Sequence, residues 1–174
     1  AFLAFNYRSD ALKMWVSVNV ILPEELKNNP DMTYKTLYLL HGLSDDHTGW
    51  IRRTGIERYA SQHGIAVVMP GVARSWYTDT ADGAPYFTFV TQELPRVCRS
   101  YFRGMTDKRE DNLIAGLSMG GYGAIKAALT YPEQYFACAA LSGALDIADP
   151  ERKVSVAEWK GIFGFDFEKS EELY

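Results

Sequence analysis

The sequence predicts an α/β protein built around a mostly parallel sheet with helices on both faces. Short apolar runs typical of buried strands alternate along the chain with segments of helix length, which is the first observation behind this prediction. The second is composition: 174 residues, 47% hydrophobic and 23% charged, are typical of one globular domain that buries a core. We therefore expect a single domain over residues 1–174, with no internal repeat.

The strands are predicted from apolar patterning. Residues 13–22, KMWVSVNVIL, alternate with period two and end at Pro23, which predicts a half-buried strand. Its apolar face would consist of Met14, Val16, Val18, Val20 and Leu22. Shorter runs that are mostly apolar predict parallel strands buried on both faces, at residues 36–41, 65–70, 112–118 and 136–143.

Helices are predicted between these strands, at residues 50–62, 86–102 and 120–130. The last one ends at the pair Tyr131-Pro132, because proline cannot continue a helix. Ligands of such sheets bind at the carboxyl ends of the strands, so the segments that follow residues 40, 70 and 117 are where we expect a functional site.

A serine between spaced glycines follows one of these strands. In Gly116-Leu117-Ser118-Met119-Gly120, a strand would turn directly into a helix, which forces the serine into a strained backbone conformation. Only very small residues two positions before and after it avoid a clash, and the hydroxyl then projects above the sheet. The pattern predicts that Ser118 is a catalytic nucleophile rather than part of a glycine-rich structural turn.

Acyl transfer also needs N–H donors for the oxyanion of the tetrahedral intermediate. The backbone N–H of Met119, directly after the serine, would supply one donor. The loop that begins His41-Gly42-Leu43 would supply the other, and we assign it to the N–H of Leu43. We interpret His41 as a structural residue whose ring ties this loop down by hydrogen bonds, rather than as a catalytic group.

Charge and composition exclude several classes of function. The net charge is −4 and the largest basic cluster is Lys108-Arg109, so we expect no nucleic-acid partner. No apolar run approaches the roughly 20 residues that span a bilayer, and the first residues show no secretion signal. We therefore expect a cytoplasmic protein without a membrane partner. Cys98 and Cys138 stand singly in predicted elements and are interpreted as free buried thiols.

Metal binding is not predicted either. Asp45, Asp46 and His47 are adjacent in one loop and have no distant partner ligands, so we interpret them as polar loop contacts. We expect no metal and no cofactor.

Several motifs together are similar to those of the esterase D-like branch of the α/β-hydrolase superfamily, and most similar to bacterial tributyrin esterases. The resemblance runs from about residue 7 to residue 165, on YLLHGLSDDHTGWIRRTGIERYA, VVMPGVARSWYTDT, ELPRV, LIAGLSMGGYGAIKAAL and LSGAL. Related families are the S-formylglutathione hydrolases, feruloyl and acetylxylan esterases, and mycolyltransferases. The resemblance implies an α/β-hydrolase fold and a carboxylesterase that cleaves small-molecule, short-chain acyl esters without a cofactor. Its nucleophile would be Ser118, and its oxyanion donors Leu43 and Met119.

The chain departs from that family in one respect. The family order is serine, then acid, then histidine, with the histidine after the last strand. Here all three histidines, His41, His47 and His63, precede Ser118. The acidic residues Asp146, Asp149 and Glu151 follow the serine, but they stand one strand too early for the catalytic acid.

Two explanations of this departure compete. Either the catalytic acid and base lie beyond residue 174, so that the chain lacks the last strands of the fold, or the protein has lost catalysis and only binds ligands. We favour the first, because residues 167–174 read as an interrupted helix. An acyltransferase with the same nucleophile is a further alternative, distinguished by whether an alcohol outcompetes water as the acceptor.

Aromatic residues near the predicted site are candidates for a substrate pocket. Trp50, Trp76 and Tyr77 belong to the loops beside Ser118 and line the pocket or simply pack. Residues 144–174 carry aromatic side chains among acidic ones, which predicts a cap over the site or a contact in a homo-oligomer.

Overall fold

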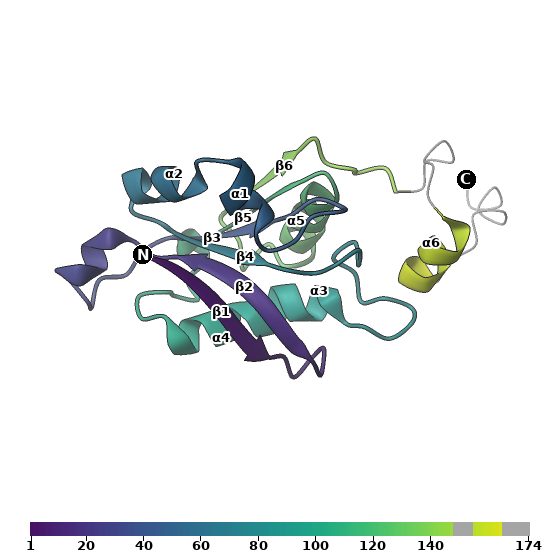
Figure 1. Cartoon of the computed structure of the whole chain (residues 1–174), viewed down its shortest axis with the longest axis horizontal. Coiled ribbons are helices and arrows are strands. Elements are labelled where there is room, and N and C mark those ends of the chain that lie inside the picture. Colours follow the sequence, from purple (N-terminus) through teal and green to yellow (C-terminus); the bar gives the residue numbers. More distant parts are fainter. Residues whose placement is uncertain (148–154, 165–174) are drawn as a thin grey trace.

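A computed structural model describes residues 1–147 and 155–164 (Figure 1). These residues form a sheet whose strands are β1 (Phe2–Arg8), β2 (Trp15–Ile21), β3 (Thr36–Leu40), β4 (Ala66–Pro70), β5 (Asn112–Leu117) and β6 (Ala137–Leu141). The helices are α1 (Gly49–Arg53), α2 (Ile56–His63), α3 (Tyr86–Thr88), α4 (Leu94–Tyr101), α5 (Met119–Thr130) and α6 (Val156–Phe163). Short 3₁₀ turns η1 (Glu24–Lys27) and η3 (Arg109–Asp111), and the π-helical turn η2 (Phe89–Glu93), complete the set.

The sheet is mixed but mostly parallel. Its six strands lie in the order β1-β2-β4-β3-β5-β6, in which β4, β3, β5 and β6 run parallel and β1 and β2 are antiparallel to their neighbours. The predicted fold class, an α/β protein with a mostly parallel sheet, is therefore confirmed.

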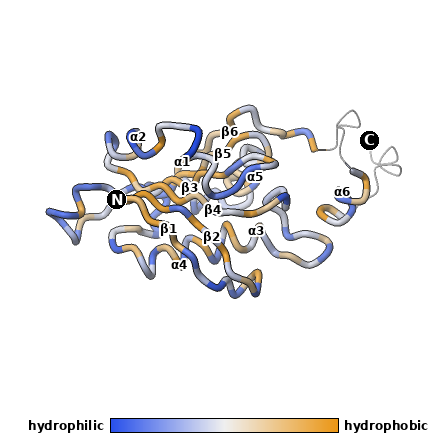
Figure 2. Tube along the Cα trace, in the orientation of Figure 1, coloured by the Kyte–Doolittle hydropathy of each residue, from blue (hydrophilic) through white to orange (hydrophobic). Residues whose placement is uncertain are grey.

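Helices cover both faces because side chains along each buried strand alternate in direction. On β4, Val67 and Met69 pack with α1 and α2 in one cluster, whereas Ala66 and Val68 pack with α4 and α5 in the larger one. Figure 1 shows α1 and α2 on the side of the sheet opposite α3 and α4. In Figure 2 the central strands are predominantly hydrophobic, whereas the helices and loops around them mix hydrophilic and hydrophobic residues.

Three details differ from the sequence prediction. Strand β1 was not predicted; it pairs with β2 from Phe2–Ile21 to Arg8–Trp15. The helix predicted at residues 50–62 is two short helices, α1 and α2, since the chain is extended at Thr54. The interpretation of Cys138 as a buried thiol was wrong: Cys98 is buried, but Cys138 is exposed because β6 is the outer strand among the described residues.

No helix in the described residues combines the length and the apolar character needed to cross a membrane.

Candidate active site

Ser118 is the single residue between the end of β5 and the start of α5, where the sequence predicted a sharp turn. Its backbone has φ 54° and ψ −114°, a combination that non-glycine residues rarely adopt. Such strain costs on the order of 1–3 kcal/mol and persists only where the surroundings impose it. The packing of β5 and α5 therefore holds the backbone of Ser118 in this strained conformation at the carboxyl end of the strand.

The two glycines that flank Ser118 have no space for a side chain. A Cβ on Gly116 would lie 2.2 Å from the backbone oxygen of Gly120. A Cβ on Gly120 would lie 2.4 Å from the oxygen of Leu40 and 2.7 Å from that of His41. All of these neighbours are backbone atoms that cannot swing aside, so the predicted reason for the glycine spacing is confirmed.

Backbone hydrogen bonds fix Ser118 from both sides. Its N–H donates to the oxygen of Leu141 at 2.9 Å, and its own oxygen accepts from the N–H groups of Tyr122 at 3.1 Å and Ala144 at 3.2 Å. The hydroxyl does not cap α5, although serine at this position often does. Among the described residues the Oγ forms no hydrogen bond, so the partly exposed hydroxyl is available to a ligand.

The loop after β3 lies directly beside Ser118. Strands β3 and β5 pair in parallel with Leu40 opposite Gly116, so the residues that follow them leave the sheet side by side. A Cβ built on Gly42 would be 3.8 Å from the Cβ of Ser118 and 3.5 Å from the oxygen of Leu117. The sheet register therefore brings together the loop and the serine that the sequence had linked only by hypothesis.

His41 is 2% exposed and joins two loops. Its Nδ1 lies 2.8 Å from the oxygen of Gly42, and its Nε2 accepts a hydrogen bond from the N–H of Val72 at 3.1 Å. Because Nε2 is the acceptor, Nδ1 carries the proton and donates it to Gly42. Burial lowers the pKa of His41, so the ring stays neutral. The predicted structural interpretation of His41 is confirmed.

These contacts also orient the peptide between Gly42 and Leu43. The oxygen of Gly42 accepts from both the His41 ring and the N–H of Asp45, the latter at 3.2 Å. In a trans peptide the C=O and the following N–H point in opposite directions. The N–H of Leu43 therefore points away from His41 and Asp45. The N–H of Met119 is the first of α5, so it has no partner within the helix.

The candidate pocket aromatics have different surroundings. Trp50 is half-buried, and its Nε1 donates to the oxygen of Leu40 at 3.1 Å. It lines a cavity of about 70 Å³ together with Gly42, Arg53 and Leu117. Patterning alone did not point to Arg53 or Leu117, because their place beside Gly42 follows from the meeting of α1 with the end of β5.

Trp76 and Tyr77 are buried, at 3% and 1% exposure. The Tyr77 hydroxyl donates to the backbone oxygen of His41 at 2.9 Å. Trp76 packs edge-on against Trp159 of α6, with ring centroids 4.9 Å apart. These contacts hold the loop after β4 to the loop after β3 on one side and to α6 on the other, and they leave little surface of either residue for a substrate.

The acidic loop forms the polar contacts that were predicted for it. Asp45 pairs with Arg52 at 3.0 Å and with Arg53 at 3.5 Å. Asp46 accepts a hydrogen bond from the N–H of Thr48 at 2.8 Å, and its pKa is lowered chiefly by its hydrogen bonds with that residue. Across residues 1–147 and 155–164, no three histidine, cysteine or acidic side chains gather as metal ligands would.

The remaining candidates for a base and an acid lie elsewhere. His63 is exposed at the end of α2, and His47 lies against Gly71. Neither ring hydrogen-bonds to Ser118 in the described part of the chain. Asp146 is exposed after β6. Asp149 and Glu151 lie outside the described residues, as do residues 165–174 of the predicted cap segment.

Comparison with known proteins gives a consistent family. Residues 9–164 match the model of a family described as "Putative esterase". An acetyl esterase of Caldicellulosiruptor saccharolyticus is 35% identical over 157 residues, which cover 84% of this chain and 58% of that protein.

Two solved structures of Staphylococcus aureus are similar over most of the chain. The fluorophosphonate-binding serine hydrolase FphF has a TM-score of 0.84 and 40% identity, over 94% of this chain and 66% of that one. The S-formylglutathione hydrolase FrmB has a TM-score of 0.69 and 42% identity, over 78% of this chain and 54% of that one. The chain thus spans less than two thirds of the length of these relatives.

Proposed function

The chain belongs to the esterase family whose model it matches, and we propose that it supplies the nucleophile and oxyanion donors of a serine carboxylesterase. The observation that carries the proposal is the conformation of Ser118. A strained serine with a free hydroxyl, raised between a parallel strand and a helix N-terminus, is costly to maintain and is what a nucleophile requires.

The proposed reaction is acyl transfer through an acyl-enzyme. The Ser118 Oγ attacks the ester carbonyl carbon while its proton passes to a general base, and the N–H groups of Leu43 and Met119 stabilise the oxyanion. Collapse of the tetrahedral intermediate releases the alcohol, which takes up the proton from the base, and leaves the acyl group on Ser118. Water, which gives its proton to the same base, then attacks the acyl-serine, and the carboxylic acid leaves as Ser118 regains its proton. This chemistry needs no cofactor.

The general base and its acid partner are proposed to come from residues beyond position 174. His41 is unsuited to be the base, because both of its ring nitrogens already have partners within the fold. His63 is exposed at the far end of α2, at the amino-terminal side of β4. The greater length of the relatives is consistent with additional residues that complete the site.

Short acyl groups are the proposed substrates. The cavity beside Gly42, lined by Trp50 and Leu117, has a volume of only about 70 Å³, which suits a group of acetyl size. The names of two relatives, an acetyl esterase and an S-formylglutathione hydrolase, support the same size class.

We further propose that residues 144–174 contribute a cap. Within its described part, α6 attaches to the loop after β4 through Trp159 and through an ion pair of Glu158 with Arg74 at 2.5 Å. This loop also carries Tyr77, whose hydroxyl donates to the backbone oxygen of His41 in the loop after β3, so α6 would stabilise one wall of the site.

Hydrolysis of p-nitrophenyl acetate by the full-length protein tests the proposal. Ser118→Ala should lower turnover by a factor on the order of 10⁶, because loss of the nucleophile leaves only binding and the oxyanion donors. Ser100→Ala is the matched control: Ser100 is exposed on α4, and we expect its rate to be unchanged. Rates that fall steeply from acetate to octanoate esters would support the short-acyl assignment. A Ser118→Ala protein with wild-type turnover would overturn the function.

A further inference from the structure

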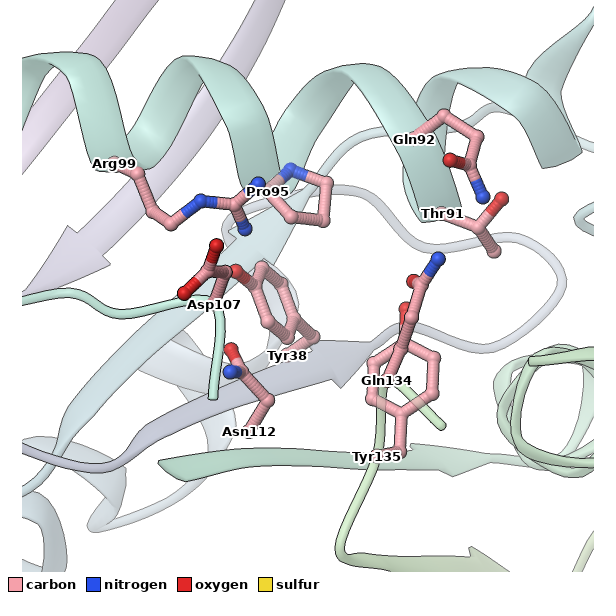
Figure 3. A pocket seen from close by; sticks show the side chains of 9 residues that line it. All are labelled: Tyr38, Thr91, Gln92, Pro95, Arg99, Asp107, Asn112, Gln134 and Tyr135. Atoms are coloured by element: carbon pink, nitrogen blue, oxygen red, sulfur yellow. The ribbon is translucent and has the colours of Figure 1, made fainter. Parts of the chain in front are cut away.

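A second pocket lies at the end of the sheet opposite Ser118. Its volume is about 200 Å³, and it opens between α4 and the amino-terminal starts of β5 and β6 (Figure 3). Asn112, the first residue of β5, and Tyr135, which precedes β6, line it. Ser118 follows the last residue of β5, so the length of that strand separates the pocket from the candidate active site.

Two buried hydroxyl groups in this pocket have no protein partner. The side chains of Tyr38 and Tyr135 are 1% and 4% exposed, and neither Oη forms a hydrogen bond with any described residue. Burial of an unpaired hydroxyl costs about 1–3 kcal/mol, and the large majority of buried polar side-chain atoms in native proteins have a partner. Burial also raises the pKa of both phenols, so each is a neutral O–H donor. The two groups call for an acceptor that the fold does not supply.

A guanidinium group faces the same space. Arg99 of α4 lines the pocket, and Figure 3 shows its side chain reaching from the helix toward Tyr38. Its charge opposes the rise in the pKa of both tyrosines, which places it within electrostatic reach of each. No ion pair joins Arg99 to another of the described residues. The N–H donors of Arg99 and the two phenolic O–H donors therefore share a pocket whose lining also includes the Asp107 carboxylate and the amide groups of Gln92, Asn112 and Gln134.

The rim of the pocket is fixed and bears one negative charge. The Asn112 Nδ2 donates to the backbone oxygens of Thr106 at 3.0 Å and Lys108 at 2.7 Å, which holds the segment that carries Asp107. The Asp107 carboxylate is exposed and lies on the Arg99 side of the pocket (Figure 3). The charges of Arg99 and Asp107 cancel, so a bound monoanion would leave a local charge of −1 and a phosphate dianion a charge of −2, and Asp107 therefore repels the dianion more strongly.

We propose that this pocket binds a small monocarboxylate, whose oxygens accept hydrogen bonds from Arg99 and from the hydroxyls of Tyr38 and Tyr135. A carboxylate is an acceptor-only group that matches the planar donors of a guanidinium. The ring of Pro95 and the faces of the tyrosines offer apolar contact for a short alkyl chain. A volume of about 200 Å³ admits acetate or propionate, but it is small compared with pockets for larger ligands.

Titration calorimetry and NMR of the full-length protein test this site. The protein is first labelled with a fluorophosphonate, so that its active-site serine is blocked, and is then titrated with sodium acetate or propionate against sodium chloride at equal ionic strength. A ligand of this size should bind with a Kd of about 1 mM or somewhat below. NMR signals of Tyr38, Tyr135 and Asn112 should shift in a saturable manner.

Variants locate the binding. Arg99→Gln and Arg99→Lys should each weaken acetate binding by about tenfold or more, since a lysine keeps the charge but loses the planar pair of donors. Arg96→Gln, an exposed arginine of the same helix, is the matched control and should bind normally. Tyr38→Phe and Tyr135→Phe each delete one oxygen; they should fold, with acetate affinity reduced about threefold to tenfold.

Three outcomes would overturn the proposal. One is the absence of saturable binding up to 50-fold above the expected Kd, roughly 50 mM. Another is binding that Arg99→Gln and both phenylalanine variants leave unchanged. The third is tighter binding of phosphate than of acetate, which would assign the pocket to a different class of anion.

Discussion

The backbone N–H of Val72 donates a hydrogen bond to the Nε2 of His41 over 3.1 Å, so one buried imidazole joins the loops that follow β3 and β4. The opposite ring nitrogen bonds to Gly42, whose Cα lies beside Ser118. We propose that His41 is a positioning residue, which orients the peptide that presents the N–H of Leu43 and exchanges no proton with the substrate.

Replacing His41 should change both stability and its dependence on pH. His41→Gln leaves buried partners unpaired and should lower the free energy of unfolding by about 1–3 kcal/mol at pH 7.5. Because burial lowers the pKa of His41 below 6.5, the unfolded chain binds its proton first as pH falls. The stabilisation is therefore present above pH 6.5 and is lost as the pH falls from there through the pKa of the folded state.

Urea unfolding between pH 5 and pH 8 checks this prediction. The wild-type protein should lose more stability on acidification than His41→Gln. His63→Gln, which changes an exposed histidine, should follow the wild-type curve. Parallel curves for wild type and His41→Gln would show that the ring is not held neutral.

Gly120 should not tolerate even a single added methyl group. Gly120→Ala places a Cβ 2.4 Å from the backbone oxygen of Leu40, and the resulting overpacking should cost about 1–3 kcal/mol or prevent folding. Gly120→Val should be worse. The control is Gly161→Ala in α6, where the nearest atom would be 3.9 Å away. Thermal unfolding compares them; equal melting temperatures would show that the helix does not pack as described.

Glu93, which is far away in the sequence, should stabilise the turn between β1 and β2 by direct hydrogen bonds. Its carboxylate accepts hydrogen bonds from the Ser9 Oγ at 2.8 Å and from the N–H groups of Asp10 and Ala11, each at 2.9 Å. Glu93→Gln removes acceptor capacity and should lower the free energy of unfolding by about 1–3 kcal/mol. Glu57→Gln, on an exposed position of α2, should have no effect. If urea unfolding showed the same loss of unfolding free energy for both variants, Glu93 would not have this stabilising role.

Neither His47 nor His63 should be the general base. In the full-length protein, His47→Gln and His63→Gln should each keep kcat/KM for p-nitrophenyl acetate within about threefold of wild type, since neither ring contacts Ser118. Loss of a true base costs on the order of 10⁴ or more. A fall of that size in either variant would place the base within this chain and would contradict the proposal that it lies beyond residue 174.

Local patterning predicted the strands from β2 to β6 and the turn at Ser118, because buried parallel strands and a strand-to-helix turn have strong local signatures. It missed β1, an edge strand whose residues alternate between exposed and partly buried positions, because the short apolar run at residues 2–5 was not interpreted as a strand. The exposure of Cys138 could not be predicted from local patterning either, because it depends on which strand is outermost.

Long-range contacts limited the prediction of the site. The adjacency of Gly42 and Ser118 rests on the register of β3 with β5, and the hydrogen bond of Tyr77 to His41 crosses 36 positions of sequence. Neither relationship has a local pattern. The pocket lined by Tyr38, Arg99, Asn112 and Tyr135 is formed by four separate segments, and so no local pattern predicted it.

The site of covalent labelling by a fluorophosphonate tests the central claim, that Ser118 is the nucleophile. The full-length protein is labelled, digested and analysed by peptide mass spectrometry. We expect the adduct on Ser118, no labelling of Ser118→Ala, and normal labelling of Ser100→Ala. An adduct on Ser44, Ser75 or Ser142 instead, or undiminished labelling of Ser118→Ala, would contradict the account.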